Sequence, residues 1–431
     1  MGIKLDASIN NKHRKLLLIL SLSFNLGLLG FFKYFNFFVD SFIDLFNLFG
    51  ITLQHRTLSI LLPVGISFYT FQTLSYTIDI YRKKITATKN ALAFFSFVSF
   101  FPQLVAGPIE RASELLPQFL KKRKFSYAFA VSGLRQILWG LFKKVVIADN
   151  IAQHVDIVYS SPENFYGLPV IIATILFTFQ VYCDFSGYSD IAIGVAKLFG
   201  FKLMTNFNTP LFSKSMKELW NRWHISLSTW FRDYLYYPLG GNKVSKPKWA
   251  LNIFITFFIS GLWHGPSVAF VVWGSLNGIY LIIEALTQDF RIRFYKLIGF
   301  VKFPTILKAT QIFFTFSLFA FSLIIFRAEN GYDALTLIGR LPQQLITQVT
   351  SVDAIISTLT PMFSTQLELV YLLCSFALFI SVDLLIRNKG IDGVLRTIPT
   401  FGRISIYYII ISWILFFGAF EKPQEFVYFQ F

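Results

Sequence analysis

The feature that most constrains this chain is a long apolar stretch with a single imidazole inside it. Between Lys248 and Glu284, His264 is the only side chain that can carry charge near neutral pH. At about 1.5 Å per residue, this stretch as one helix would reach roughly 50 Å, whereas the hydrocarbon core of a bilayer is about 30 Å thick. The stretch must therefore fold back or break, and Gly265-Pro266 is where a helix would fail.

His264 is a candidate functional residue for an energetic reason. A titratable group at membrane depth is costly, and irregular backbone is tolerated there only around a cavity that protein lines. The alternative is a buried histidine whose ring is satisfied by a backbone carbonyl. We predict that His264 lies at the helix break and belongs to a site.

The composition places the whole chain in a membrane. Of its 431 residues, 55% are hydrophobic and 14% are charged, whereas soluble domains carry about 25% charged residues. The net charge of +16 does not indicate nucleic acid, because the basic residues are scattered beside apolar spans and suit anionic membrane lipids better. We expect an all-α, polytopic integral membrane protein with a single membrane-embedded domain over residues 1–431.

About nine segments are expected to cross the bilayer, at 16–38, 57–80, 128–147, 166–184, 249–263, 266–285, 309–326, 368–386 and 404–420. Lys and Arg are enriched in cytoplasmic loops, which places the N-terminus inside and the loop 149–165, which has neither, outside. The segment 91–108 has basic clusters on both flanks and contains two prolines, so we expect it to be re-entrant. The basic segment 201–247 is expected to be cytoplasmic and interfacial.

Residues 213–247 have the pattern of an amphipathic helix. Ser215 with Glu218 forms a capping box, which is a signature of a helix start. An apolar stripe then recurs at intervals of four and three residues, formed by Met216, Trp220, Trp223, Leu227, Trp230 and Tyr234. Beside it runs a polar stripe of Lys217, Asn221, His224 and Ser228.

Two interpretations of this helix are open. In one, it is a tryptophan-rich anchor in the membrane interface and His224 is merely solvated. In the other, the helix folds inward, so that His224 meets a tunnel that leads to His264.

Four further charged residues are candidates. Asp184 and Asp190 flank a polar run after the fourth predicted span, where capping of a helix end and a role in the site are equally compatible with the sequence. Arg222 and Arg232 can pair with the phosphates of a coenzyme A-type donor, although a solvated interfacial role is the more frequent outcome.

The chemistry is narrowed by what the sequence lacks. It contains no Gly-x-Ser-x-Gly elbow, no Walker loop, no His-Glu-x-x-His run and no cluster with zinc spacing, so no metal is predicted. A neutral imidazole, with a pKa of about 6.5, can deprotonate a hydroxyl that attacks a thioester directly. Acyl transfer is therefore the simplest interpretation of the sequence. The alternative is a transporter or channel, because broken helices also mark transport sites, although we find no internal repeat.

Several sequence motifs occur in the same order along the chain as in the membrane-bound O-acyltransferases, and they resemble the motifs of that family. These motifs are Pro63–Gln72, Phe101–Arg111, Asp184–Asp190, Asn221–Leu227 and Trp263–Gly265. Together they are similar to the bacterial branch that includes alginate and peptidoglycan O-acetyltransferases. The resemblance implies that His264 is the catalytic histidine and that His224 is the second signature histidine, at the donor side of a tunnel, and we predict that both are catalytic residues. The further donor or tunnel candidates are Asn221, Arg222, Ser228, Trp263, Asp184 and Asp190.

The same resemblance implies the substrates and the location. We expect acetyl-CoA or another acyl thioester as the cytoplasmic donor, no tightly bound cofactor, and an extracytoplasmic polysaccharide or partner protein as the acceptor. The expected location is the bacterial cytoplasmic (inner) membrane, and D-alanyl transfer to teichoic acid is the nearest alternative activity. The block Asn25–Tyr34 normally follows about two further helices, so we expect an N-terminally short form.

Overall fold

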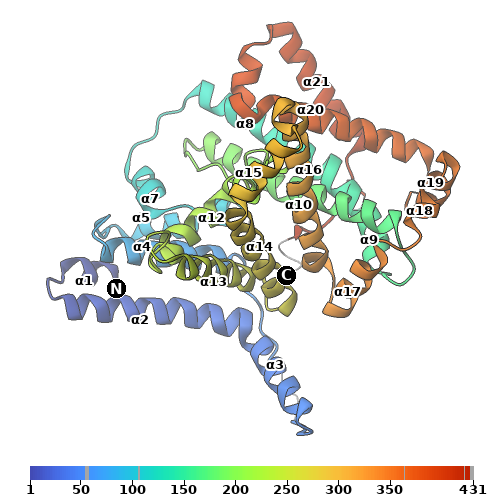
Figure 1. Cartoon of the computed structure of the whole chain (residues 1–431). Helices are drawn as coiled ribbons and strands as arrows, with labels where there is room; N and C mark the ends of the chain where they lie inside the picture. Colours follow the sequence, from blue (N-terminus) through green and yellow to red (C-terminus); the bar gives the residue numbers. More distant parts are fainter. Residues whose placement is uncertain (54–57, 105–106, 364, 422, 428–431) are drawn as a thin grey trace.

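All regular structure in this protein is helical wherever the chain is described. The computed structural model describes residues 1–431 apart from 54–57, 105–106, 364, 422 and 428–431, and no strand occurs in this described part (Figure 1). Long apolar helices dominate it. The predicted all-α, polytopic fold class is therefore confirmed.

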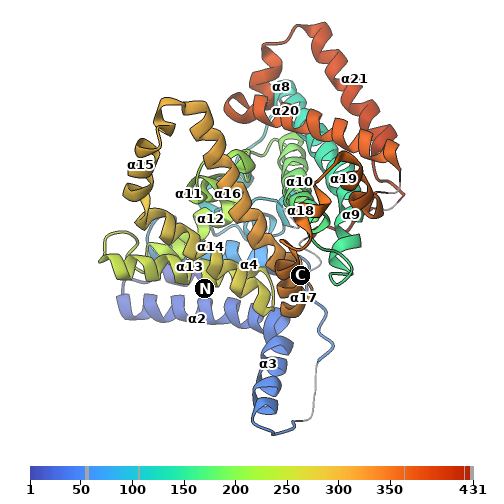
Figure 2. The same ribbon diagram turned by 45° about the vertical axis from the view of Figure 1, so that its right-hand side comes forward.

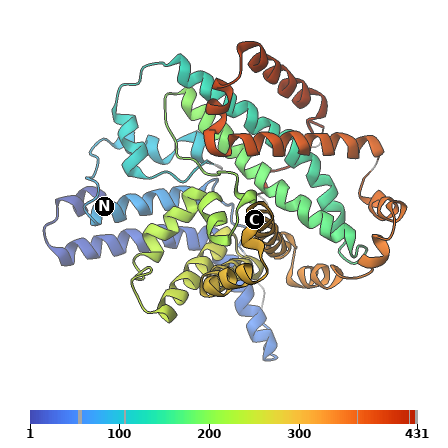
Figure 3. The ribbon, with the colours of Figure 1, turned by 45° about the horizontal axis from the view of Figure 1, so that its top comes forward.

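Helices α8 and α10 pack closely along each other, and they run side by side through the upper right of Figure 3. α10 (Leu168–Leu198) has 31 residues, and α8 (Tyr127–Leu141) continues through the π-helical η2 (Phe142–Ala148) into α9 (Asp149–Tyr159). A Cβ atom added at Gly187 would lie 2.8 Å from the carbonyl oxygen of Gly140. Small residues at a helix crossing let the two backbones touch, and that is how α8 and α10 pack.

The apolar stretch that contains His264 forms two helices packed against each other. α13 (Lys246–His264) ends at the histidine, Gly265 is extended with φ −174° and ψ 166°, and α14 (Val268–Leu286) begins three residues later. α16 (Pro304–Arg327) packs against both α14 and α10. The predicted break at Gly265-Pro266 is confirmed.

The N-terminal helices form a second layer. They are α1 (Gly2–Ala7), α2 (Asn11–Leu29), the π-helical η1 (Gly30–Tyr34) and α3 (Phe35–Leu48). α2 packs against α4 (Ile66–Tyr81), whereas α3 extends away from the rest of the molecule (Figure 2). Lys33, the only charged residue between Lys15 and Asp40, lies in the π-helical turn between α2 and α3.

The remaining helices outside the segment 201–245 are α5 (Ala91–Val98), α6 (Phe101–Leu104), α7 (Ala112–Leu120), α15 (Gln288–Leu297), η5 (Phe300–Lys302), α17 (Gly331–Arg340), α18 (Leu345–Gln348), α19 (Val352–Leu359), η6 (Thr360–Met362), α20 (Gln366–Arg396) and α21 (Thr400–Phe417). Gly390 kinks α20, because its φ of 64° is not helical.

A helix lies at each of the nine predicted spans. Six helical stretches are long and apolar enough to cross a membrane, namely Asn11–Leu48, Leu168–Leu198, Val268–Leu286, Pro304–Arg327, Leu367–Arg396 and Thr400–Phe417. The other three predicted spans correspond to α4, to α8 with η2, and to α13. That these three also cross remains a prediction.

Two predicted boundaries differ clearly from the structure. The second span was expected to begin at residue 57, but α4 begins at Ile66, because Pro63 and the left-handed Gly65 (φ 75°) disfavour a helix before that residue. The fourth was expected to end at residue 184, but α10 runs on to Leu198. The segment 91–108 forms the short helices α5 and α6, and residues 105–106 of it lie outside the described part. Its re-entrant path remains a prediction.

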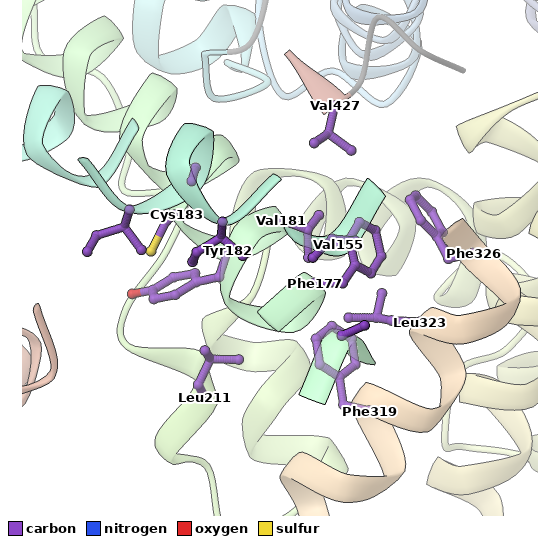
Figure 4. Close-up of a cluster of buried hydrophobic side chains, with 14 of the residues drawn as sticks. Val155, Phe177, Val181, Tyr182, Cys183, Leu211, Phe319, Leu323, Phe326 and Val427 are labelled. Carbon is purple, nitrogen blue, oxygen red and sulfur yellow. The ribbon is translucent and has the colours of Figure 1, made fainter. Parts of the chain in front are cut away.

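The largest cluster of buried apolar side chains among the described residues includes side chains of α9, α10 and α16 (Figure 4). Phe177 and Val181 of α10 meet Phe319 and Leu323 of α16 there, and Val427 from the C-terminal segment joins them. This core fixes α16 beside α14, so it holds one wall of the site in place.

Candidate active site

The imidazole of His264 lies in a cage of aromatic rings at the end of α13. It is 5% exposed. Its ring centroid lies 5.0 Å from that of Trp273 on α14 and 5.5 Å from that of Phe326 on α16, with both rings nearly perpendicular to the imidazole. Trp263, the preceding residue, supplies the third ring at 5.0 Å. Three helices therefore fix the imidazole at the break.

His224 lies at a second break, which the sequence pattern did not predict. The expected single helix is two helices, α11 (Met216–Arg222) and α12 (Ile225–Phe231), followed by the π-helical η4 (Arg232–Tyr236). Between α11 and α12, His224 adopts the left-handed conformation with φ 42° and ψ 54°. The prediction of one continuous amphipathic helix is therefore wrong.

Asn206 stabilises this turn. Its carbonyl oxygen accepts the N–H of Ile225 at 2.8 Å. Its side-chain Oδ1 accepts from Ser226 Oγ at 2.8 Å and from the Ser226 N–H at 3.3 Å, and Nδ1 of His224 lies 3.1 Å from it. Because the Ser226 N–H can only donate, this atom is the amide oxygen, and Nδ1 of His224 must carry the proton. The basic lone pair of His224 is consequently on Nε2.

His224 is not solvated. It is 1% exposed, and the apolar stripe residues Met216, Trp223, Leu227 and Trp230 are buried with it. Burial lowers the pKa of His224 to about 3, so its ring is neutral at physiological pH. The interpretation in which His224 is merely solvated is therefore wrong, while the cytoplasmic and interfacial location of the segment 201–247 remains a prediction.

The two imidazoles share one neighbour, the indole of Trp263. The ring centroid of His224 lies 6.1 Å from that of Trp263, and the centroid of His264 lies 5.0 Å from it. Residues 40 positions apart in the chain are thereby brought to one place. The structure thus places His224, Trp263 and His264 in a single aromatic cluster, while their chemical roles remain predictions.

A cavity of about 210 Å³ lies between the segment α11–η4 and the face of α13. Asn221 and Ser228, two of the predicted donor or tunnel candidates, line it, and Ser260 lines it from α13; their role remains a prediction. Ser260 is four residues before His264, so both side chains lie on the same face of the helix. The cavity therefore lies along the face of α13 on which His264 follows, while within the described residues none of His224, Trp263 and His264 lines it.

The cavity is amphipathic. Its apolar wall includes Trp220, Leu227 and Phe231, whereas Lys217 and Arg232 supply cationic groups. A long, apolar ligand that ends in an anion matches this distribution of side chains.

The two predicted arginines differ in their placement. The Arg232 side chain lines the cavity, is half exposed, and forms an ion pair of 2.8 Å with Asp233. Arg222 does not line the cavity within the described part of the chain. Instead it forms an ion pair of 3.0 Å with Glu218 and donates to the carbonyl oxygen of Asn208 at 3.1 Å.

Asp184 and Asp190 lie inside α10 rather than at a helix end, so the capping interpretation is wrong. The cause is that α10 continues beyond the predicted span. Asp184 forms an ion pair of 2.7 Å with Lys144 and accepts the N–H of Val427 at 2.7 Å. Asp190 forms an ion pair of 2.6 Å with Lys143. Both carboxylates tie η2 to α10, and the structure does not bring them to His264.

Asn206 is a site residue that the sequence analysis missed. It is fully buried in the irregular segment between α10 and α11, where no periodicity or motif marks it. The one local signal is a pair of asparagines, Asn206 and Asn208, before Pro210. That signal indicates a turn but does not indicate which histidine the turn supports.

Comparison with known proteins identifies a family whose model matches this chain. A model described as "MBOAT, membrane-bound O-acyltransferase family" matches residues 82–326, a range that contains both histidines. The chain is 40% identical over 334 residues to the probable alginate O-acetylase of Pseudomonas aeruginosa, which covers 77% of this chain and 61% of that relative. The chain therefore spans about 61% of that relative's length.

Two other relatives carry different names. The chain is 36% identical over 366 residues to the peptidoglycan O-acetyltransferase of Helicobacter pylori, covering 78% of this chain and 66% of the relative. It is 30% identical over 241 residues to the teichoic acid D-alanyltransferase of Streptococcus thermophilus, covering 53% of this chain and 58% of the relative.

Proposed function

The chain belongs to the membrane-bound O-acyltransferase family, and from this premise we propose that it transfers an acetyl group from a cytoplasmic thioester to an extracytoplasmic hydroxyl. The observation that carries the proposal is the convergence of His224 and His264 on Trp263 beside an amphipathic cavity. Membership of the family favours an enzyme over the transporter that broken helices alone would also allow.

His264 is the general base in this proposal. Its imidazole accepts the proton of the acceptor hydroxyl while the oxygen attacks the thioester carbonyl carbon. The C–S bond then breaks, the protonated imidazole returns the proton to the leaving thiolate, and an ester and a free thiol result. No acyl-enzyme forms, so no nucleophilic side chain is needed.

The cavity is the donor site. Its apolar wall of Trp220, Leu227 and Phe231 suits the pantetheine arm of acetyl-CoA. The cations of Lys217 and Arg232 suit the phosphates, because charge-assisted pairs of this kind are the stronger ones. We assign Asn221 and Ser228 to the amide and carbonyl groups of the donor.

His224 has a different role from His264 in the proposed reaction. Because its Nδ1 hydrogen faces Asn206 and its ring is neutral, it packs against Trp263 as an uncharged group. We assign it to the donor side of the tunnel, where it holds the indole between the two imidazoles.

The acceptor is a hydroxyl of a polysaccharide or of a partner protein outside the cytoplasmic membrane of a bacterium. The names of two relatives, an alginate O-acetylase and a peptidoglycan O-acetyltransferase, support a polysaccharide. The D-alanyltransferase relative is less similar, at 30% identity against 40%, which favours acetyl over D-alanyl transfer.

The test uses radiolabelled acetyl-CoA and membranes that contain the parent chain, Arg232→Gln, or Arg293→Gln as the control. Arg293 is an exposed arginine on α15 that does not line the cavity within the described residues. We expect the parent and the control to label an acceptor at the same donor concentration. Arg232→Gln should need about 5- to 20-fold more donor, because it loses a charge-assisted pair.

Two outcomes would contradict the proposal. One is transfer from a D-alanyl thioester but not from acetyl-CoA, which would favour the alternative activity. The other is an equal donor requirement in Arg232→Gln and Arg293→Gln, which would place the donor outside this cavity.

A further inference from the structure

The broken end of α13 is capped by two side chains from another helix. The hydroxyl of Tyr34 donates to the carbonyl oxygen of Leu262 at 2.6 Å. The ammonium of Lys33 donates to the carbonyl oxygens of Trp263 and His264, each at 2.9 Å. Three consecutive carbonyls, ending with that of His264 itself, therefore receive their donors from η1.

These carbonyls need outside donors because of where α13 stops. The last four C=O groups of an α-helix have no partner within the helix. Gly265 is extended, so the chain does not continue the turn, and Pro266 has no N–H to offer. A cation at a helix C-terminus also stabilises the negative end of the helix dipole.

The placement of Lys33 is costly unless it serves the site. It is the only charged residue in the apolar run between Lys15 and Asp40, inside the candidate span Asn11–Leu48, and a charge within a membrane span marks a functional position. It lies in a π-helical turn, which is a rare geometry found frequently at functional sites. Its ammonium also lies 5.9 Å from the ring centroid of Trp263.

We propose that Lys33 and Tyr34 are positioning residues that set the place of the His264 imidazole by fixing the last turn of α13. They do so through backbone carbonyls, so neither side chain needs to touch the substrates. The inference rests on the proposed acetyl transfer. It adds two residues, other than the two signature histidines, to those that support the reaction.

The inference predicts an effect on the chemical step rather than on donor binding. A displacement of a catalytic group by about 1 Å can cost roughly 100-fold in rate. The donor cavity is lined from α11, α12, η4, α13 and α14, and neither Lys33 nor Tyr34 lines it within the described residues. Loss of the caps should therefore lower kcat and leave the donor KM nearly unchanged.

Arg14 provides a matched control in the helical stretch Asn11–Leu48, which also contains Lys33. Its guanidinium donates to the carbonyl oxygens of Ile80 at 3.1 Å and Tyr81 at 2.9 Å, which are the last residues of α4. It is thus another cation of the N-terminal helices that caps the end of another helix, but within the described residues neither Arg14 nor that helix end lines the donor cavity.

The experiment measures kcat and the donor KM of purified Lys33→Met, Lys33→Arg, Tyr34→Phe and Arg14→Met, each normalised to folded, monodisperse protein. Lys33→Met should lower kcat about 10- to 100-fold with a donor KM within about twofold of the parent. Lys33→Arg keeps a cationic donor and should restore most of kcat. Tyr34→Phe should lower kcat about 3- to 10-fold, and Arg14→Met should leave it unchanged.

Three results would overturn the inference. The first is a parent-like kcat in Lys33→Met. The second is an equal loss of kcat in Lys33→Met and Arg14→Met, which would show a general effect of capping. If Lys33→Met does not fold, a parent-like kcat in Tyr34→Phe is the third. A parent chain without any transfer would instead contradict the proposed function, and this inference with it.

Discussion

The backbone at His224 has a conformation that few residues other than glycine adopt. The left-handed region, which it occupies with φ 42°, costs roughly 1–2 kcal/mol for an L-residue. Asn206 offsets this cost with hydrogen bonds to Ile225 and Ser226 on the far side of the turn. The same turn directs the imidazole towards Trp263, so the strained backbone conformation of His224 and the position of its ring have one cause.

This account predicts that the backbone and the imidazole of His224 can be separated by substitution. Asparagine tolerates the left-handed region, so His224→Asn should fold with a melting temperature close to that of the parent. Acetyl transfer should fall about 100-fold, because the ring that supports Trp263 is lost. Transfer assays per amount of folded protein would measure this.

Gln344 supplies the control for that substitution. It is also left-handed, with φ 52°, but lies at the start of α18, away from the site. Gln344→Asn should behave as the parent does. Parent-like transfer by His224→Asn would show that the imidazole is dispensable.

Two residues of the site differ in how well the sequence reveals them. Lys33 is an isolated charge in an apolar run, the same criterion that identified His264, so the sequence contained its signal. Asn206 has no such signal, because its partners are neighbours only after the chain has turned back on itself. Burial of a polar group in an irregular segment is visible only in the folded structure.

At the scale of elements, α10 shows why the polar run from Asp184 to Asp190 does not end a helix. Its carboxylates are paired with Lys143 and Lys144 of η2, so they are tolerated inside the protein. Apolar patterning predicted the first half of α10 and stopped where the charges begin. The second half depends on partners about 40 residues away, which periodicity does not show.

The crossing of α8 and α10 gives a test at this scale. Gly187→Ala would place a methyl group 2.8 Å from the carbonyl oxygen of Gly140, so the helices must separate. We expect a loss of about 1–3 kcal/mol in the free energy of unfolding, as overpacking usually causes. Denaturant or thermal unfolding in a mild detergent would measure it.

Gly27 in α2 is the matched control, because nothing lies within 4 Å of the position a Cβ atom would take there. Gly27→Ala should be neutral or slightly stabilising, since alanine is the better helix former. Equal stability of the two variants would mean that α8 and α10 do not touch at Gly187.

At the scale of the whole molecule, the site is assembled from segments that are far apart in the sequence. α13 and α14 come from the apolar stretch, α11–η4 come from the basic segment 201–247, and η1 comes from the N-terminal layer. The sequence predicted each of these segments as a helix or a break. It left open whether the segment of α11 and α12 folds inward, because a Trp-rich amphipathic helix suits a membrane interface as well as a protein interior.

The central claim is that His264 performs the chemistry and does not merely fill space. His154 allows a fair comparison, because it too is buried, at 3% exposed, and its Nδ1 lies 2.7 Å from the carbonyl oxygen of Met362, away from Trp263. The most direct measurement is single-turnover acetyl transfer by purified His264→Gln and His154→Gln, with donor binding measured separately.

The account predicts that both variants bind the donor about as tightly as the parent, that His154→Gln transfers at the parent rate, and that His264→Gln is about 10²- to 10⁴-fold slower. Transfer by His264→Gln at the parent rate would contradict it.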